Sequence, residues 1–396
     1  MKNEKILLWT LAAVNFTHIV DFMILMPLGP QLMRIFEISP REFGLLVSSY
    51  TFSAGLSSFL GAFVLDKYDR RKLLLWVFVG FLLGTLACAL SPNYPFLLVS
   101  RIVSGVFGGL TSALIMAIIG DVVPDSRRGR AMGLVMAAFS VASVFGVPFG
   151  LFIASLSNWH APFFFLAGVS VIILALIYRY IPHITGHLGS GQVKPSPLQV
   201  VRRVTSNSNQ MRAITLTIMM MLGQFTIIPF LSPYMVANVG FTDMQLTYIY
   251  VFGGLFTIFT SPWVGRLTDK YGKVKIFTIF MSLNVVPIAI ITHLGVTPIP
   301  FVLLVSSMFF VTSNGRMVPA AALITGTARP ENRGSFLSFN SAVQQLAAGA
   351  ASFVAGLILA EGINGQLLNY NIVGYIAIIL SLLCIPLVRR IKVIDQ

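Results

Sequence analysis

The chain has 396 residues, of which 56% are hydrophobic and only 10% are charged, and its formal net charge is +14 at pH 7. A soluble domain carries roughly 25% charged residues, so this composition excludes a water-soluble protein and predicts one that lies in a lipid bilayer. The basic residues fall in small clusters between apolar runs, so the positive charge indicates membrane topology and not a nucleic-acid partner.

Apolar runs long enough to cross a bilayer recur along the whole chain. A helix needs about 20 apolar residues to span the hydrocarbon. The runs are continuously apolar and do not alternate, which favours helices over a barrel. We therefore predict an all-α membrane protein with twelve transmembrane helices. The predicted spans are residues 6–33, 43–65, 73–90, 95–119, 131–155, 162–180, 212–236, 244–265, 275–294, 300–323, 335–360 and 370–388.

The basic residues also predict how the spans are oriented. If both termini are cytoplasmic, every lysine and arginine except Arg34, Arg41, Arg101 and Arg316 falls at the cytoplasmic ends of the spans. Membrane proteins carry such an excess in their cytoplasmic loops. We expect a multi-pass protein with both termini cytoplasmic, and its short loops favour a bacterial inner membrane.

Three sequence patterns occur twice, about half a chain apart. This spacing predicts a duplicated six-span unit. The stretch 182–211 contains glycines, prolines and serines without a long apolar run, so we predict an N-terminal bundle over 1–181, a cytoplasmic linker over 182–211 and a C-terminal bundle over 212–396. The paired patterns are Asp66-Lys67-Tyr68-Asp69-Arg70-Arg71 with Asp269-Lys270-Tyr271-Gly272-Lys273 (offset 203), residues 27–30 with 229–233 (offset 202), and residues 124–129 with 330–334 (offset 206).

With these repeats, the sequence resembles the major facilitator superfamily over essentially its whole length. The loop between spans 2 and 3 of that family has the signature Gly-x-x-x-Asp-Arg/Lys-x-Gly-Arg/Lys-Arg/Lys. Residues 265–273 match it, whereas the first-half copy has Ala62 and Asp69 at the two glycine positions. The resemblance implies two pseudo-symmetric six-helix bundles, the major facilitator fold, and secondary active transport by alternating access.

Within that superfamily the chain looks like the drug:proton antiporter and sugar-efflux branch. Residues 101–109 are similar to its Arg-x-x-x-Gly-x-x-Gly pattern. Gly146-Val147-Pro148-Phe149-Gly150 is close to the antiporter signature Gly-Pro-x-x-Gly, with one residue between the glycine and the proline. We expect the glycines at 105, 108, 109, 146 and 150 to allow close helix packing.

The resemblance also implies gating roles at the cytoplasmic face. Charged residues of the two turns would form ion pairs and helix-dipole contacts that hold one conformation closed; Arg127, Arg128 and Arg333 would lie beside them. The alternative is that these charges are solvated and only set the topology. The predicted gating residues are Asp66, Lys67, Arg70, Arg71, Asp269, Lys270, Gly146, Pro148 and Gly150.

Three charged residues fall well inside predicted spans, where a charge costs at least about 2.5–3.5 kcal/mol on insertion scales. Asp21 is the acidic one, and His18 lies on the same helical face. Burial disfavours an ionised carboxylate and a nearby arginine favours it, so a site that alternates between these surroundings can take up and release a proton. We predict that Asp21, Arg101 and His18 couple transport to protons. The alternative interpretation is that they are structural partners inside the bundle.

Arg316 is the third of these charges. Gly315 and Pro319 would loosen its helix, which suggests substrate or gate chemistry; a salt bridge or a carbonyl clamp is the alternative. Uncharged polar residues in spans, including Asn284, Asn340 and Gln345, either line a cavity or make interhelical hydrogen bonds. The predicted substrate-binding residues are Arg316, Asn314, Gln224, Gln344 and Asn15.

Two functions remain open at this point. The first is proton-coupled antiport that exports small amphipathic compounds or drugs. The second is transport or exchange of an organic anion or a sugar-like solute, because two arginines against one aspartate leave the interior at +1. Gly-x-Ser-x-Gly, His-Glu-x-x-His and paired aspartates do not occur, so we expect no enzyme, no metal and no cofactor. The expected partners are a small-molecule substrate, protons and the bilayer, and we expect a monomer.

Overall fold

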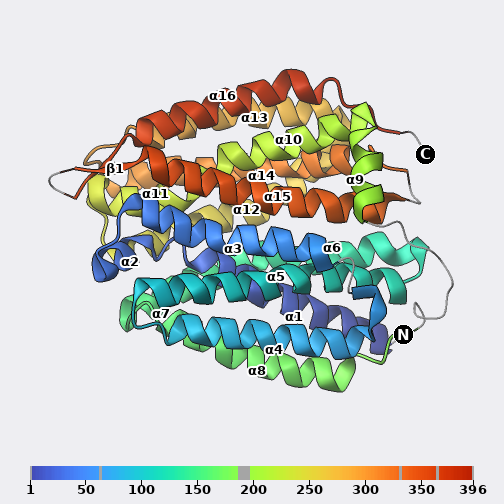
Figure 1. Cartoon of the computed structure of the whole chain (residues 1–396). Helices are drawn as coiled ribbons and strands as arrows, with labels where there is room; N and C mark the ends of the chain where they lie inside the picture. Colours follow the sequence, from blue (N-terminus) through green and yellow to red (C-terminus); the bar gives the residue numbers. More distant parts are fainter. Residues whose placement is uncertain (1, 62–64, 186–196, 330–331, 363–364, 395–396) are drawn as a thin grey trace. The chain divides into compact units, whose positions relative to one another are not determined.

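The computed structural model describes residues 2–61, 65–185, 197–329, 332–362 and 365–394 (Figure 1). Within these ranges, eleven helical segments are long and apolar enough to cross a membrane. A short antiparallel ribbon, β1 (Ala360–Glu361) with β2 (Leu367–Leu368), is the only sheet in this described part. The predicted all-α membrane fold is confirmed.

Contacts divide the chain into two compact units. Unit 1 consists of Met1–Leu25 and Ser49–Pro197. Its helices α4, α5 and α8 lie side by side, with α1 packed against α5, α6 and α8 (Figure 1). The elements of unit 1 are α1 (Lys2–Ile24), the second part of α3 (Pro40–Gly61), the 3₁₀-helix η1 (Leu65–Lys67), α4 (Arg70–Ala89), α5 (Tyr94–Val122), α6 (Asp125–Val141), the π-helix η2 (Ala142–Gly146), α7 (Val147–Leu156) and α8 (Ala161–Tyr180).

Unit 2 consists of Met26–Ser48 and Leu198–Gln396. In it α13 packs along α14 and α16, and α10 packs along α15 and α16. Its elements are α2 (Gly29–Phe36), the first part of α3, α9 (Pro197–Thr205), α10 (Ser208–Phe225), α11 (Ile228–Tyr234), the π-helix η4 (Met235–Val239), α12 (Asp243–Tyr271), α13 (Lys273–Ile291), α14 (Ile299–Thr325), α15 (Arg333–Ile358), the β1–β2 ribbon and α16 (Tyr370–Val388).

The first predicted span, 6–33, is not one helix. Helix α1 ends at Ile24, and α2 begins at Gly29 after a turn. Pro30 lies in the first turn of α2, where the missing N–H of proline costs nothing, whereas proline further inside a helix breaks its hydrogen bonds. The prediction of a continuous run to residue 33 is therefore wrong, and the first membrane-crossing segment ends at Ile24.

Two other predicted segments, 244–265 and 182–211, differ from the observed elements. Residues 244–265 lie within α12, a continuous helix of 29 residues, although α12 is not among the eleven membrane-crossing candidates. In the predicted linker 182–211, α9 forms and α10 begins, while residues 186–196 lie outside the described part. The domain limits 1–181, 182–211 and 212–396 stay predictions.

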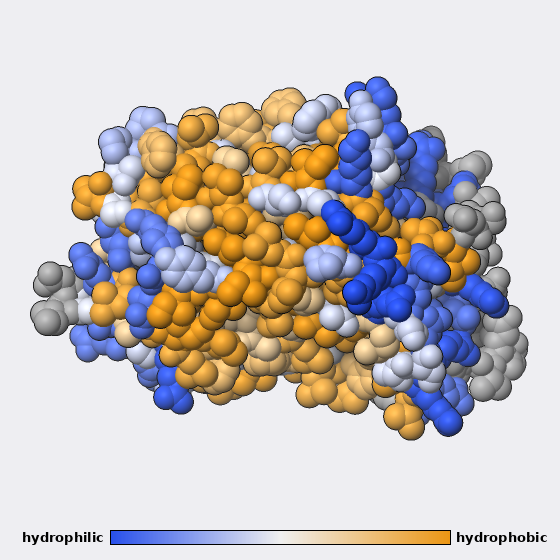
Figure 2. Space-filling view, turned by 90° about the horizontal axis from the view of Figure 1, so that it is seen from above, coloured by the Kyte–Doolittle hydropathy of each residue, from blue (hydrophilic) through white to orange (hydrophobic). Residues whose placement is uncertain are grey.

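Each unit has its own apolar core. In unit 1 it is built from α1, α4, α5 and α8, with Phe78, Phe81, Ile115 and Ile118 fully buried. In unit 2 it includes Leu216, Phe277 and Cys384. On the face in Figure 2, hydrophobic residues cover the middle of the helices and hydrophilic residues gather toward their ends. That distribution suits helices whose outer surface meets lipid.

Helix α5 approaches α3 closely through two glycines. A Cβ at Gly105 would lie 2.4 Å from the carbonyl oxygen of Tyr50, and one at Gly109 would lie 2.1 Å from that of Ala54. Backbone atoms cannot move aside as a flexible side chain can. The expectation that Gly105 and Gly109 permit close helix packing is therefore confirmed.

We expect Gly109→Ala to destabilise the protein by about 1–3 kcal/mol, because the added methyl group overpacks the α3–α5 contact. The measurement is thermal unfolding of the purified full chain in detergent. Gly133→Ala is the matched control, since a Cβ at Gly133 in α6 meets nothing within 4 Å. Equal melting temperatures for the two variants would contradict this account.

Candidate transport and gating sites

A fully buried ion pair joins α1 to α5. Arg101 Nη1 lies 2.8 Å from Asp21 Oδ2, and both side chains are 0% exposed. The same Nη1 donates to the Asp21 carbonyl oxygen at 3.2 Å, and Thr85 of α4 donates its hydroxyl to Asp21 Oδ1 at 3.0 Å. The structure thus brings together the two charges that the sequence predicted as a coupling pair.

A line of polar groups extends from this pair to His18. The Arg101 guanidinium lies over the ring of Tyr50, 4.4 Å from its centroid. The Tyr50 hydroxyl is 3.5 Å from His18 Nδ1, and His18 Nε2 is 2.9 Å from the Ser112 hydroxyl. A Cβ at Gly108 would lie 2.4 Å from the Tyr50 hydroxyl, so this glycine leaves room for the contact.

Three members of this cluster were not predicted from the sequence: Thr85, Tyr50 and Ser112. Hydroxyl side chains are common in apolar helices, where they usually bond to the backbone of their own helix. Thr111, next to Ser112, does so, donating to the Phe107 carbonyl oxygen at 2.8 Å. Sequence alone does not distinguish the two kinds of hydroxyl.

The glycine–proline motif lies against α1 beside Asp21. A Cβ at Gly146 would lie 2.4 Å from Val20 Cγ2, and one at Gly150 would lie 2.6 Å from Ile24 Cδ1. Gly146 ends the π-helix η2, and Pro148 lies in the first turn of α7. Three residues predicted to gate transport, Gly146, Pro148 and Gly150, therefore belong to the segment that packs on α1, the helix that carries Asp21.

The first-half turn holds a buried arginine. Arg70, which begins α4, is 0% exposed; its Nε lies 2.8 Å from Asp121 Oδ2, and its Nη1 donates to the Leu65 carbonyl oxygen. Arg71 donates to the Tyr178 carbonyl oxygen and lies over the Tyr178 ring. Lys67 is exposed, and the side chain of Asp66 lies outside the described part.

Asp69 has a role that the sequence did not predict. It is the N-cap of α4, and its carboxylate accepts from the Arg71 N–H at 2.9 Å and from the Ile184 N–H at 3.3 Å. It also pairs with His183. Desolvation acts to raise the pKa of Asp69, but hydrogen bonds from His183, Arg71 and Ile184 outweigh it, so the pKa lies below its ordinary value of 3.8.

The second-half turn is built differently. Gly272 takes the position of Asp69 and has φ of 91°, a backbone conformation that favours glycine. Asp269 is exposed, and Lys270 lies over the ring of Tyr271. The first half has Asp69 in place of this glycine. Its turn has a different backbone conformation, because Asp69 has φ of −54°.

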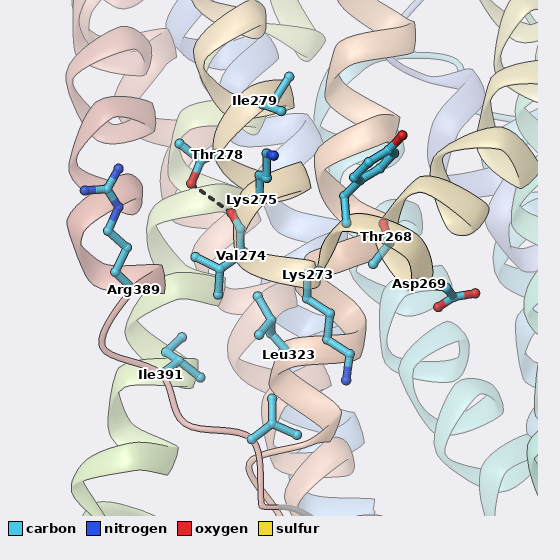
Figure 3. A pocket seen from close by; sticks show the side chains of 13 residues that line it. Thr268, Asp269, Lys273, Val274, Lys275, Thr278, Ile279, Leu323, Arg389 and Ile391 are labelled. Atoms are coloured by element: carbon cyan, nitrogen blue, oxygen red, sulfur yellow. Dashed lines mark hydrogen bonds between the residues drawn. The ribbon is translucent and has the colours of Figure 1, made fainter.

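A pocket of about 870 Å³ adjoins this second turn (Figure 3). Among the predicted site residues whose side chains the structure describes, Asp269 alone lies in its wall. Figure 3 shows Lys273 and Lys275 pointing in different directions, with Arg389 on the opposite wall, so the basic groups do not converge. The lining residues are Thr268, Asp269, Tyr271, Gly272, Lys273, Val274, Lys275, Thr278, Ile279, Leu323, Arg389, Ile391 and Val393.

Arg316 is buried inside unit 2, where it is 1% exposed. Its Nη1 lies 3.2 Å from Met281 Sδ and 3.5 Å from the Ser381 hydroxyl, and its Nη2 lies 3.4 Å from Gln224 Oε1. Two predicted substrate-binding residues, Arg316 and Gln224, are therefore in contact.

The other predicted substrate-binding residues do not join them. Asn314 donates to the Ser261 hydroxyl at 3.2 Å, and Asn15 donates to the Val135 carbonyl oxygen at 2.9 Å, each bond linking two helices. Asn340 likewise accepts from Thr217 at 2.7 Å. Gln344 is half-buried on α15. These contacts have the form of the interhelical bonds that the sequence left as an alternative.

Comparison with known proteins identifies the family. The model of the Major Facilitator Superfamily matches residues 11–313 and 213–395. The chain belongs to the major facilitator superfamily. It is thus a transporter and not an enzyme.

Relatives of this superfamily member include bacterial transporters. The chain is 25% identical over 353 residues to the uncharacterized MFS-type transporter YceJ of Bacillus subtilis, covering 89% of this chain and 88% of YceJ. It is 27% identical over 259 residues to a probable sugar efflux transporter of Helicobacter pylori, covering 64% of this chain and 63% of that protein.

Solved structures share the fold. A D-xylose–proton symporter is 18% identical, with a TM-score of 0.74 over 98% of this chain and 99% of the symporter. The nucleoside transporter NupG is 15% identical, with a TM-score of 0.75 over 97% of this chain and 99% of NupG.

We expect Asp69→Ala to cost about 1 kcal/mol of stability through loss of the α4 cap, and Asp69→Asn to cost less because asparagine still caps. A carboxylate with a lowered pKa stabilises the fold above the ordinary pKa and loses this effect as the pH falls through the folded-state pKa. The deficit of Asp69→Asn should therefore be present at neutral pH and shrink below about pH 4. Melting temperatures across this range in detergent test the prediction, and a deficit that grows on acidification would contradict it.

Proposed function

We propose that this superfamily member is a proton-coupled secondary transporter that exports small amphipathic compounds by alternating access, with Asp21 and Arg101 as its coupling site. The observation that carries the proposal is the fully buried Asp21–Arg101 pair between α1 and α5. The chain would lie in a bacterial inner membrane as a monomer, and its basic residues predict that both termini are cytoplasmic.

The energetics of the pair suit a coupling role. An isolated charge inside a membrane protein is costly, and removing one partner of a buried pair leaves the other uncompensated. When the helices move apart or water enters, the Asp21 carboxylate can be neutralised by a proton in place of Arg101. When the pair forms again, the proton is released. Arg101 thus competes with the proton for one carboxylate.

The surroundings of the pair support this exchange. Thr85 holds one carboxylate oxygen while Arg101 holds the other, so losing Arg101 need not leave Asp21 without a hydrogen bond. Tyr50, His18 and Ser112 continue the polar line. A displacement of α1 also alters its contact with Gly146 and Gly150, which connects the coupling pair to the antiporter motif.

Transport of a sugar-like solute or an organic anion is the second candidate. A buried arginine, Arg316, faces polar neighbours in unit 2, and some relatives are named probable sugar efflux transporters. This candidate is a transporter or an exchanger, and it does not depend on proton coupling through Asp21.

We expect substrate to displace protons from the wild-type protein and not from Asp21→Asn. The measurement is the pH change of a weakly buffered detergent solution of purified full chain on addition of ethidium, arabinose or benzoate, repeated at several pH values. We expect at least one compound to release protons from the wild type, because binding of the compound and protonation of Asp21 exclude one another.

Glu361→Gln is the matched control, since it removes an exposed carboxylate in the β1–β2 ribbon and should release protons as the wild type does. If Asp21→Asn behaves like the wild type with every compound, the pair is structural and proton coupling through Asp21 is wrong.

A further inference from the structure

Arg316 has no carboxylate partner among the described residues of the chain. Its contacts are a thioether, a hydroxyl and an amide oxygen at 3.2–3.5 Å, and its Nε has no hydrogen-bond partner. Arg101, equally buried, has a carboxylate at 2.8 Å. An uncompensated charge at this depth is expensive, so its presence calls for an explanation beyond packing.

A second unpaired donor lies one helical turn away. Asn284 of α13 is 0% exposed, and its Oδ1 accepts from Thr312 and Ser313 of α14. Its Nδ2 has no partner in the described part of the chain. Ser313 precedes Arg316 by three residues on α14, and Asn284 follows Met281 by three on α13. The Asn284–Ser313 contact and the Met281–Arg316 contact are thus separated by about 4.5 Å along the helices. Each leaves a buried donor, Asn284 Nδ2 or Arg316 Nε, without an acceptor among the described residues.

The position that corresponds to Asp21 in the second half carries no charge. Asp21 and Gln224 lie 203 positions apart, the offset that relates the two charged turns. Each comes near the end of the first long helix of its half, α1 or α10. Each contacts a buried arginine, Asp21 at 2.8 Å and Gln224 at 3.4 Å. The second half therefore has a neutral amide where the first half has a carboxylate, while Arg316, 215 positions after Arg101, is not the repeat counterpart of that arginine.

We propose that Arg316, with Asn284 and Gln224 beside it, binds the carboxylate of a small organic anion, and that this anion is the transported substrate. The inference rests on the proposed transport function, whose substrate class it names. A guanidinium binds carboxylates through paired, charge-assisted hydrogen bonds, and these would satisfy the unpartnered Nε. A lipophilic cation would instead add a second positive charge.

Access to the site requires the helices around it to bend. Proline interrupts the backbone hydrogen bonds of both α13, at Pro287, and α14, at Pro319, and such interruptions permit kinks. Gly315 is in tight contact with Phe280, since a Cβ there would lie 2.3 Å from the ring. A small displacement of Phe280 or α14 would therefore open the contact beside Arg316.

The test measures melting temperatures of the purified full chain in detergent at constant ionic strength. Benzoate is compared with its neutral analogue benzamide and its cationic analogue benzylamine, and acetate and gluconate are added as further carboxylates. We expect at least one carboxylate to raise the melting temperature of the wild type, and the amide and amine to have no such effect. No shift with any of the three carboxylates would overturn the proposal.

Variants then locate the site. Arg316→Gln should weaken carboxylate binding about tenfold or more, whereas Arg316→Lys keeps the charge and should retain part of it. Gln224→Glu should raise the melting temperature without any ligand and abolish the carboxylate shift, because it places a carboxylate beside Arg316. Gln245→Glu, at the start of α12, adds the same charge elsewhere and should leave the shift unchanged. A shift that survives both Arg316→Gln and Gln224→Glu would place the anion elsewhere and sink the idea.

The outcome is separable from that of the coupling proposal. Carboxylate binding that depends on Arg316 but displaces no proton would leave the anion site standing and remove proton coupling. Proton displacement by arabinose or ethidium, without carboxylate binding, would do the reverse.

Discussion

The cost of placing a charge where water is scarce governs the interior of this protein. Asp21 and Arg101 meet this cost together, since each compensates the other at 2.8 Å. Because the compensation is mutual, neither residue can change its charge or position without affecting the other. The close packing of α3 on α5 at Gly105 and Gly109, and of η2 and α7 on α1, holds the helices that carry the pair. The helix packing of unit 1 therefore keeps Asp21 and Arg101 in contact.

Much of this arrangement could be predicted from the sequence because few residues in the spans are charged. Apolar runs located most of the helices, and Asp21, Arg101 and Arg316 stood out against them. Thr85, Tyr50 and Ser112 could not be predicted, because hydroxyls in helices usually bond to their own backbone and their orientation depends on packing. The separation of α1 from α2 was also missed, since hydropathy continues through Pro27 and Pro30 even though the helix does not.

The two copies of the charged turn illustrate how a repeat can keep its place and lose its geometry. Gly272 permits a left-handed backbone between α12 and α13. Asp69 occupies the same position in the first half, but there it caps α4 and holds Ile184. The similar sequences of the two turns predicted similar roles. The turns differ because only the second has a glycine at the position that requires a positive φ. The same reasoning applies to Asp21 and Gln224, whose positions correspond and whose charges do not.

The π-helix η2 has a consequence for where the segment that packs on α1 can bend. The signature Gly-Pro-x-x-Gly and the stretch Gly146-Val147-Pro148-Phe149-Gly150 have the same spacing between their glycines, so this chain shifts the proline by one position and inserts nothing. Residues four apart lie on one face of a helix, and Gly146 and Gly150 both lie against α1. Pro148 lies in the first turn of α7, directly after η2. Prolines and π-turns are the usual places for a helix to kink, so the bend of this segment falls between its two contacts with α1.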